Sequence, residues 1–248
     1  MRVECRDLGV KAGETALLEG LSLSFDAPAL VGILGPNGAG KSTLLRCLAG
    51  YRRPSRGEVL WNGRPLAAWQ AGERGAICGY CPQQFEPAWD YSVAEIVALG
   101  RDRNLTDART LDEILRSNGV DPLARRRWSQ LSGGERARTM LAATLSTEPP
   151  LVLADEPGAS LDMRHRLALL ERLKAYAAAG RALVIVVMHD LDLALRFCDR
   201  LVLLDGGKVT ADKPAQEMVT EPAFEAAFQL RLQTHPRRVD RDWVLGLG

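Results

Sequence analysis

The sequence lacks a long hydrophobic run. Its longest strongly apolar stretch is ALVIVVM at residues 182–188, which is far shorter than the run of about 20 residues that a helix needs to cross a bilayer. The first residues, MRVECRDLGV, also contain no apolar run of the kind that marks a signal peptide. We therefore expect a soluble chain whose role at any membrane comes through a partner protein.

The chain also lacks a charge excess and a regular cysteine framework. It has 32 Lys and Arg against 31 Asp and Glu, for a net charge of +1, which gives no argument for binding nucleic acid or an anionic membrane. An odd count of five cysteines indicates free thiols in a reducing compartment. Cys78 and Cys81 form a C-x-x-C, but the second pair that a structural zinc site needs is missing. We read this segment as a strand with small side chains.

What the chain does contain is an alternation of apolar runs and helical patterns, in 248 residues of which 46% are hydrophobic. This size suits one large α/β domain, or a domain with a subdomain. Strands are predicted at 29–34, 58–63, 76–81, 151–155 and 183–189, and a hairpin over 200–211. Helices are predicted at 42–50, 92–100, 108–119 and 134–146. Because no strand separates the last three helices, we expect a helical insertion at roughly 86–145.

A glycine-rich segment, GPNGAGKST at 35–43, fits the phosphate-loop pattern G-x-x-x-x-G-K-[ST]. It follows a predicted strand and opens a predicted helix, so backbone N–H groups and the helix N-terminus would form an anion cradle. Lys41 is expected to reach the β and γ phosphates of a nucleotide, and Ser42 to ligate Mg²⁺. The candidate nucleotide-binding residues are Gly35, Pro36, Asn37, Gly38, Ala39, Gly40, Lys41, Ser42 and Thr43. The dinucleotide fingerprint G-x-G-x-x-G does not fit, which disfavours NAD.

Acidic side chains follow the predicted strand at 151–155. Asp155 and Glu156 lie at its carboxyl end, the edge where open α/β sheets bind ligands. Asp155 is a candidate Mg²⁺ ligand, and Glu156 is the candidate general base for an attacking water. His189 ends the next strand at the same edge and is a candidate contact for the γ phosphate, while Asp190 caps the following helix.

The segment LSGGE at 131–135 places two glycines at the start of a predicted helix. Ser132 and Glu135 have the spacing of a capping box, which explains those two residues but not the glycines between them. Glycine disfavours a helix, yet it leaves the N–H groups of Gly133 and Gly134 open to a phosphate. The sequence therefore predicts a second phosphate-binding helix start in a chain that already has one.

Together these motifs resemble those of the ATP-binding cassette family, the motor subunits of ABC transporters, over roughly residues 3–225. GPNGAGKST is similar to the Walker A loop, LVLADEP (151–157) to the Walker B strand and LSGGE to the signature. CPQ (81–83) resembles the Q-loop, which makes Gln83 a candidate catalytic residue and metal ligand. ASLD (159–162) resembles the D-loop with Asp162 as a nucleotide-site residue, and His189 resembles the switch histidine.

The resemblance implies an α/β P-loop NTPase fold of the ABC ATPase type. That fold has a mostly parallel core sheet, an N-terminal antiparallel β subdomain and an inserted helical subdomain. It divides the chain into one ABC ATPase domain at 1–225 and a C-terminal tail at 226–248. Within the domain, 1–85 and 146–225 would form the catalytic core and 86–145 the helical signature subdomain.

The resemblance also implies an ATPase that works as a pair, with ATP and Mg²⁺ bound between two cassettes arranged head to tail. Ser132, Gly133 and Gly134 would then hold the γ phosphate of a nucleotide that belongs to the partner copy. We expect a homodimer of this chain on transmembrane permease subunits, with a substrate-binding protein as an indirect partner and no nucleic acid. Such an assembly places the chain at the cytoplasmic face of the inner membrane.

The transported substrate is indicated only by local resemblance. VAEIVALGR (93–101) and NGRPLAAW (62–69) resemble importers of iron–siderophore complexes, haem and cobalamin, although the usual Pro after GR is missing. We favour an iron–siderophore complex or haem, with cobalamin next. An exporter motor and a soluble non-transport ABC ATPase are the alternatives, and a kinase would have no use for LSGGE.

Three segments depart from the family pattern or allow two readings. An aromatic residue that stacks on adenine is usual near Ala12, but the next aromatic is Phe25, so we predict poor discrimination between ATP and GTP. The D-loop reads GASLD rather than a TSALD-like form, yet it keeps Asp162. Phe85 and Trp89 fall in a segment that receives the permease in the family, and they belong either to that groove or to the core of the helical subdomain.

Overall fold

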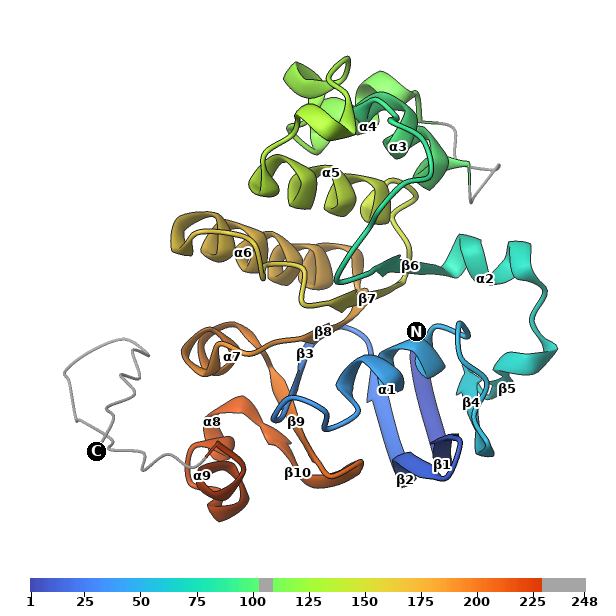
Figure 1. Ribbon diagram of the computed structural model, residues 1–248, viewed down its shortest axis with the longest axis vertical. Helices are drawn as coiled ribbons and strands as arrows, with labels where there is room; N and C mark the ends of the chain where they lie inside the picture. The colour runs from blue at the N-terminus through green and yellow to red at the C-terminus, as the bar shows by residue number, and fades with distance from the viewer. Residues whose placement is uncertain (103–108, 229–248) are drawn as a thin grey trace.

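A mostly parallel sheet forms the centre of the computed structural model, which describes residues 1–102 and 109–228 (Figure 1). Its six strands are arranged in the order β10-β9-β3-β8-β7-β6. All neighbours pair in parallel except β9 and β10, which form the expected hairpin. The strands are β3 (Ala29–Leu34), β6 (Cys78–Cys81), β7 (Leu151–Asp155), β8 (Leu183–Val187), β9 (Arg200–Asp205) and β10 (Lys208–Pro214). The carboxyl ends of β3, β6, β7 and β8 therefore share one edge.

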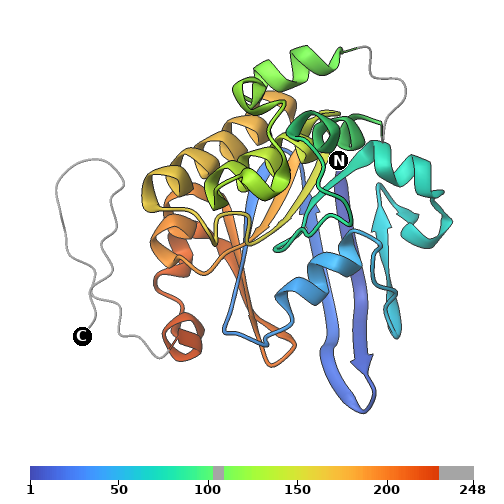
Figure 2. The same cartoon turned by 45° about the horizontal axis from the view of Figure 1, so that its top comes forward.

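A second, antiparallel sheet has the order β2-β1-β4-β5. It consists of β1 (Arg2–Ala12), β2 (Thr15–Asp26), β4 (Arg56–Trp61) and β5 (Arg64–Pro65). Helix α1 (Lys41–Leu48) lies between the two sheets in Figures 1 and 2. Its buried leucines Leu44, Leu45 and Leu48 join one apolar cluster with side chains of both sheets. The start of α1, where the phosphate loop ends, is thereby held firmly against the core.

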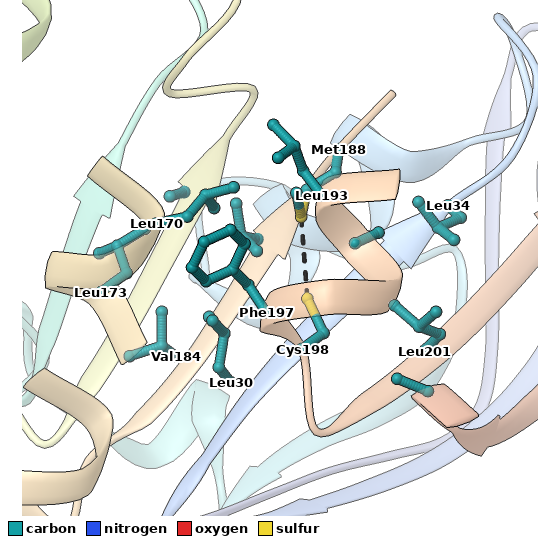
Figure 3. Close-up of a cluster of buried hydrophobic side chains, with 14 of the residues drawn as sticks. Leu30, Leu34, Leu170, Leu173, Val184, Met188, Leu193, Phe197, Cys198 and Leu201 are labelled. Atoms are coloured by element: carbon teal, nitrogen blue, oxygen red, sulfur yellow. Dashed lines mark hydrogen bonds between the residues drawn. The ribbon is translucent and has the colours of Figure 1, made fainter. Parts of the chain in front are cut away.

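Helices also cover the opposite face of the core sheet. They are α6 (Met163–Gly180), α7 (Leu191–Phe197), α8 (Ala215–Met218) and α9 (Pro222–Phe228). Figure 3 shows the apolar cluster that joins α6 and α7 to the strands, in which Cys198 Sγ donates to Met188 Sδ at 3.8 Å. The five cysteines are all buried, and none of them forms a disulfide within the described residues. Cys78 and Cys81 are the first and last residues of β6, so the C-x-x-C is a strand segment, as expected. In the described residues no group of three or more His, Cys, Asp or Glu side chains is placed to hold a metal.

Three helices without an intervening strand form a separate helical segment, as predicted. They are α3 (Val93–Arg101), α4 (Leu111–Ser117) and α5 (Gly133–Leu145), and they lie together at the top of Figure 1. They enclose their own apolar cluster, which includes Val93, Ile96, Ile114 and Trp128. Phe85 packs edge-on against the Trp128 ring at 5.3 Å between centroids, whereas the Trp89 residue is 72% exposed. Phe85 therefore packs against this cluster, whereas Trp89 faces solvent.

Several predicted limits were wrong. The strand predicted at 58–63 ends at Trp61, because Asn62 and Gly63 have positive φ and turn the chain into β5. The strand predicted at 76–81 begins only at Cys78, since residues 76 and 77 end helix α2 (Ala71–Ile77), which was not predicted. The strand predicted to reach 189 ends at Val187, the last residue that pairs with β7.

The helix predicted at 108–119 is shorter, and residue 108 lies outside the described residues. Helix α9 continues to Phe228, so the first three residues of the tail predicted at 226–248 belong to a helix. The rest of that tail also lies outside the described residues. Short 3₁₀ turns occur at η1 (Leu66–Ala68), η2 (Asp121–Leu123) and η3 (Trp128–Gln130). Across the described residues, no helix is both long and apolar enough to span a bilayer.

Candidate active site

The glycine-rich loop between β3 and α1 adopts a backbone that only glycine accepts readily. Gly35, Gly38 and Gly40 have φ values of 144°, 81° and 96°, a region that L side chains rarely enter. A Cβ at Gly35 would lie 2.0 Å from the carbonyl oxygen of Leu204, and one at Gly40 would lie 2.7 Å from that of Leu17. A Cβ at Gly38 would meet nothing within 4 Å. Packing thus fixes the two ends of the loop, while its middle borders open space.

Lys41 is the buried cation of this loop. Its Nζ donates to the carbonyl oxygens of Gly35 at 2.7 Å and Pro36 at 2.8 Å. Burial lowers the pKa of the ammonium, and the negative charges of Glu156 and Asp155 act in the opposite direction. Hydrogen bonds to the loop itself therefore hold the positive charge where the loop curves, which suits an anionic ligand.

Asp155 and Ser42 form the second polar pair at this edge. Ser42 Oγ donates to Asp155 Oδ1 at 2.9 Å, and Asp155 is fully buried. Burial raises the pKa of its carboxyl, with the Ser42 hydrogen bond acting against that shift. Asp155 Oδ2 is buried and has no hydrogen-bond partner within the described part of the chain. An unpaired buried acceptor costs about 1–3 kcal/mol, and oxygen donors of this kind are those that Mg²⁺ prefers, so the residues fit the expected ion.

Glu156 is held between two other side chains. Gln83 Nε2 donates to Glu156 Oε2 at 2.8 Å, and His189 Nε2 lies 2.5 Å from Glu156 Oε1. The three residues follow β6, β7 and β8, so the shared edge of three parallel strands brings them together. Glu156 has a φ of 49°, a left-handed conformation that is uncommon for a residue with a side chain. This turn is what separates its carboxylate from that of Asp155, which faces Ser42.

The start of α5 forms the capping box that the spacing predicted. Ser132 N donates to Glu135 Oε2 at 2.8 Å, and Glu135 N donates to Ser132 Oγ at 3.3 Å. A Cβ on Gly133 would meet Ser160 at 3.5 Å, and one on Gly134 would meet Leu161 at 3.6 Å. Both distances are ordinary contacts, so packing within one chain does not demand glycine at either position. Among the described residues, no hydrogen bond joins this helix start to the phosphate loop 35–43.

Asp162 and Ala12 are not among the residues that hydrogen-bond to the Glu156 side chain in the described part of the chain. Asp162 is the N-cap of α6 and accepts from His165 N at 2.9 Å and from His165 Nδ1 at 2.8 Å. The hydrogen bond from the His165 backbone, followed by that from its ring, lowers the pKa of the Asp162 carboxyl. Ala12 is exposed at the end of β1, and Phe25 is fully buried in the core. Phe25 is therefore not available to stack on a base.

The structure thus gathers six of the predicted site residues at one sheet edge, namely Lys41, Ser42, Gln83, Asp155, Glu156 and His189. The predicted signature residues Ser132, Gly133 and Gly134 lie instead on the helical segment. One polar residue near the site was missed from the sequence. Arg166, on α6, contacts both the 157–162 loop and the residue after His189, and no motif marks it.

Comparison with known proteins decides the family. The sequence model of a family described as ABC transporter matches residues 18–159. The chain belongs to the ABC transporter family. It is an ATP-binding subunit of that family, an ATPase that couples ATP hydrolysis to transport.

Named relatives in this ABC transporter family extend over nearly the whole chain. The hemin import ATP-binding protein HmuV of Bradyrhizobium diazoefficiens is 40% identical over 243 residues, which are 94% of this chain and 90% of that protein. The cobalamin import ATP-binding protein BtuD of Halobacterium salinarum is 35% identical over 238 residues, which are 94% of this chain and 60% of that protein.

Solved ABC cassettes confirm the predicted fold. A bacterial ABC transporter cassette in a dimeric structure has a TM-score of 0.80 at 26% identity, covering 86% of this chain and 99% of that one. A dimeric cassette in a post-hydrolysis state, bound to ADP and Pi, has a TM-score of 0.79 at 27% identity, with the same coverage. The antiparallel N-terminal sheet and the mostly parallel core sheet of the chain are those of an ABC cassette.

Proposed function

We propose that this chain is the ATP-hydrolysing motor subunit of an importer whose substrate is haem. Hemin import ATP-binding proteins of three organisms are 40%, 37% and 38% identical to it over more than nine-tenths of its length. The cobalamin import protein at 35% identity supports cobalamin as the second candidate. Haem is therefore preferred over the iron–siderophore complex and over cobalamin.

One observation carries the proposed chemistry, the placement of Glu156 between Gln83 and His189 beside the phosphate loop. In the proposal, Glu156 accepts the proton of the attacking water, and the other two side chains fix the orientation of its carboxylate. A positioned general base contributes typically about 10²–10⁴-fold to a rate. We expect Glu156→Gln to lose ATP hydrolysis by about that factor while it still binds ATP. Wild-type hydrolysis in this variant would contradict the assignment.

The remaining site residues are proposed to bind and orient the nucleotide. Residues 35–43 would surround its phosphates through backbone N–H groups, with the Lys41 ammonium at the β and γ phosphates. Ser42, Asp155 and Gln83 would hold Mg²⁺. When bound, the ion supplies charge neutralisation at the transferring phosphoryl group. The buried, unpaired Asp155 Oδ2 supports this assignment.

A pair of chains completes the proposed site. Ser132, Gly133 and Gly134 of one copy would cap the γ phosphate held by its partner, and Asp162 would lie at the same interface. Two facts support this arrangement, the absence of a packing reason for either glycine and the likeness to cassettes with dimeric structures. The separate apolar cluster of the helical segment supports a signature subdomain at 86–145, inserted between the core segments 1–85 and 146–225.

The proposed assembly places two copies of this chain on transmembrane permease subunits at the cytoplasmic face of the membrane, with a substrate-binding protein beyond it. Growth of the source organism tests the substrate. A strain without this gene should fail to grow with haem as its only iron source, and the wild-type gene but not Glu156→Gln should restore growth. Normal growth on haem together with lost cobalamin-dependent growth would replace haem by cobalamin.

A further inference from the structure

Arg166 joins two segments that line the same cavity beside the active site. It is on the first turn of α6, and its Nη2 donates to the carbonyl oxygen of Leu161 at 3.0 Å. Its Nη1 donates to Asp190 Oδ2 at 3.4 Å. A Cβ on Gly158 would come within 3.1 Å of Arg166 Cγ, so the 157–162 loop also packs on the stem of this side chain.

The second partner, Asp190, ties Arg166 to the His189 segment. Asp190 follows His189 directly, and its Oδ1 accepts from Leu193 N at 3.2 Å as the N-cap of α7. One carboxylate therefore orients α7 and binds Arg166 at the same time. Through this pair, the main chain at Leu161 is fixed relative to the residue next to His189.

The surroundings of Arg166 distinguish its two hydrogen bonds from ordinary surface contacts. Both segments line a cavity of about 230 Å³, and Gly158, Arg166, Met188, His189 and Asp190 are among its lining residues. Arg166 Nε is buried there without a hydrogen-bond partner in the part of the chain that the structure describes. Close packing therefore does not fill the space that these two segments line, and the Arg166 guanidinium bonds to both of them.

We propose that Arg166 is a positioning residue that couples the 157–162 loop to His189, and thereby couples one nucleotide site to the site of the partner copy. The inference rests on the proposed function, in which Asp162 lies at the interface between two copies. The side chains of Arg166 and Asp190 are 31% and 25% exposed, and ion pairs of this exposure contribute little to stability. The Arg166–Asp190 pair therefore positions the two segments more than it stabilises the fold.

Kinetics of the assembled transporter test the proposal. Arg166→Gln should lower kcat by about 10- to 100-fold, the range that misplacement of reacting groups produces, with KM changed by less than about two-fold. The Hill coefficient for ATP should fall toward one. Arg166→Lys keeps the charge but loses the fork that reaches two acceptors, so it should restore little of the rate. Arg164→Gln removes a charge from the same turn at an exposed position and should leave all three values unchanged.

A double-mutant cycle separates coupling from damage to the fold. Asp190→Asn keeps a good N-cap and loses only the ion pair, so its effect on kcat and that of Arg166→Gln should not add. Additive effects, or a wild-type kcat and Hill coefficient in Arg166→Gln, would overturn the proposal. Wild-type hydrolysis by Glu156→Gln together with a non-additive Arg166–Asp190 pair would instead overturn the assignment of the base and leave the coupling intact.

Discussion

Asp155 is the residue whose environment has the clearest consequence for pH. Burial raises the pKa of its carboxyl, so as the pH falls Asp155 takes up a proton at a higher pH than an ordinary aspartate does. A protonated carboxyl no longer attracts a cation. We therefore expect Mg²⁺-dependent nucleotide binding to weaken at a pH where unperturbed carboxylates are still ionised.

Binding of a fluorescent ATP analogue, titrated with and without Mg²⁺ at each pH, measures this effect at Asp155. The difference between the two affinities should disappear first, while binding without Mg²⁺ persists. If both affinities fall in parallel as the pH is lowered, Asp155 is not the group responsible.

Ala12 gives a second prediction at the residue scale. It is exposed near the tip of the β1–β2 hairpin, where it pairs with Thr15, and it offers no ring to a base. We expect the wild-type chain to hydrolyse ATP and GTP with similar kcat/KM, and Ala12→Tyr to tighten binding of both nucleotides by at least about fivefold, since stacking on a ring is worth about 1–3 kcal/mol.

Ala16→Tyr is the matched control for this change. Ala16 is exposed on the same hairpin and pairs with Lys11, the neighbour of Ala12. Successive residues of a strand face opposite sides, so this ring would lie on the other face and should leave nucleotide affinity unchanged. A large preference of the wild-type chain for ATP would show that another group reads the base.

Much of the site could be predicted at the residue scale, because its motifs are local. The spacing within 35–43 and the Asp155–Glu156 pair lie at strand ends that the apolar runs define. Arg166 could not be predicted, since its partners Leu161 and Asp190 are five and 24 positions away and the contact exists only in the folded chain. The pairing of Gln83 with Glu156, 73 positions apart, likewise needs the sheet order.

At the scale of elements, the start of α5 gives a test in which stability and ATP hydrolysis should change in opposite directions. An alanine at Gly133 or Gly134 would meet only ordinary contacts, and alanine favours a helix over glycine by up to about 1 kcal/mol. The double variant Gly133→Ala, Gly134→Ala should therefore raise the unfolding temperature and lower ATP hydrolysis, because the added methyl groups obstruct the helix start.

Gly72→Ala, in helix α2, is the control for this pair. A Cβ at Gly72 would meet nothing within 4 Å, so the variant should gain stability without losing hydrolysis. Thermal unfolding and steady-state ATPase assays on the same preparations check both statements. Unchanged hydrolysis in the double α5 variant would remove the argument that the two glycines serve a phosphate.

Element types could be read from the sequence more reliably than their ends. The apolar runs of β3, β7 and β8 are buried on both faces and stand out in the sequence. The long strands β1 and β2 do not, because register shifts after Cys5, Leu8 and Val10 interrupt the regular alternation. Helix α2 was missed since none of its residues is fully buried, which leaves no apolar stripe to detect.

At the scale of the whole molecule, the arrangement of strands was beyond local reasoning. Strand β3 lies between β8 and β9, which begin about 150 and 170 positions after it in the chain, and no periodicity encodes that insertion. The fold was predicted because the set of motifs resembles one family. The helical segment could be inferred directly, since three helical patterns in succession cannot extend a sheet.

The proposed nucleotide site needs two molecules rather than one, because the α5 start of one copy completes the site of its partner. The mass of the Glu156→Gln chain in solution, measured with ATP and Mg²⁺, tests it most directly. The Glu156→Gln chain should shift from the mass of one chain to that of two when ATP is added, and it should not shift when Ser132→Arg is introduced into the same chain. A Glu156→Gln chain that binds ATP yet keeps the mass of one chain would contradict it.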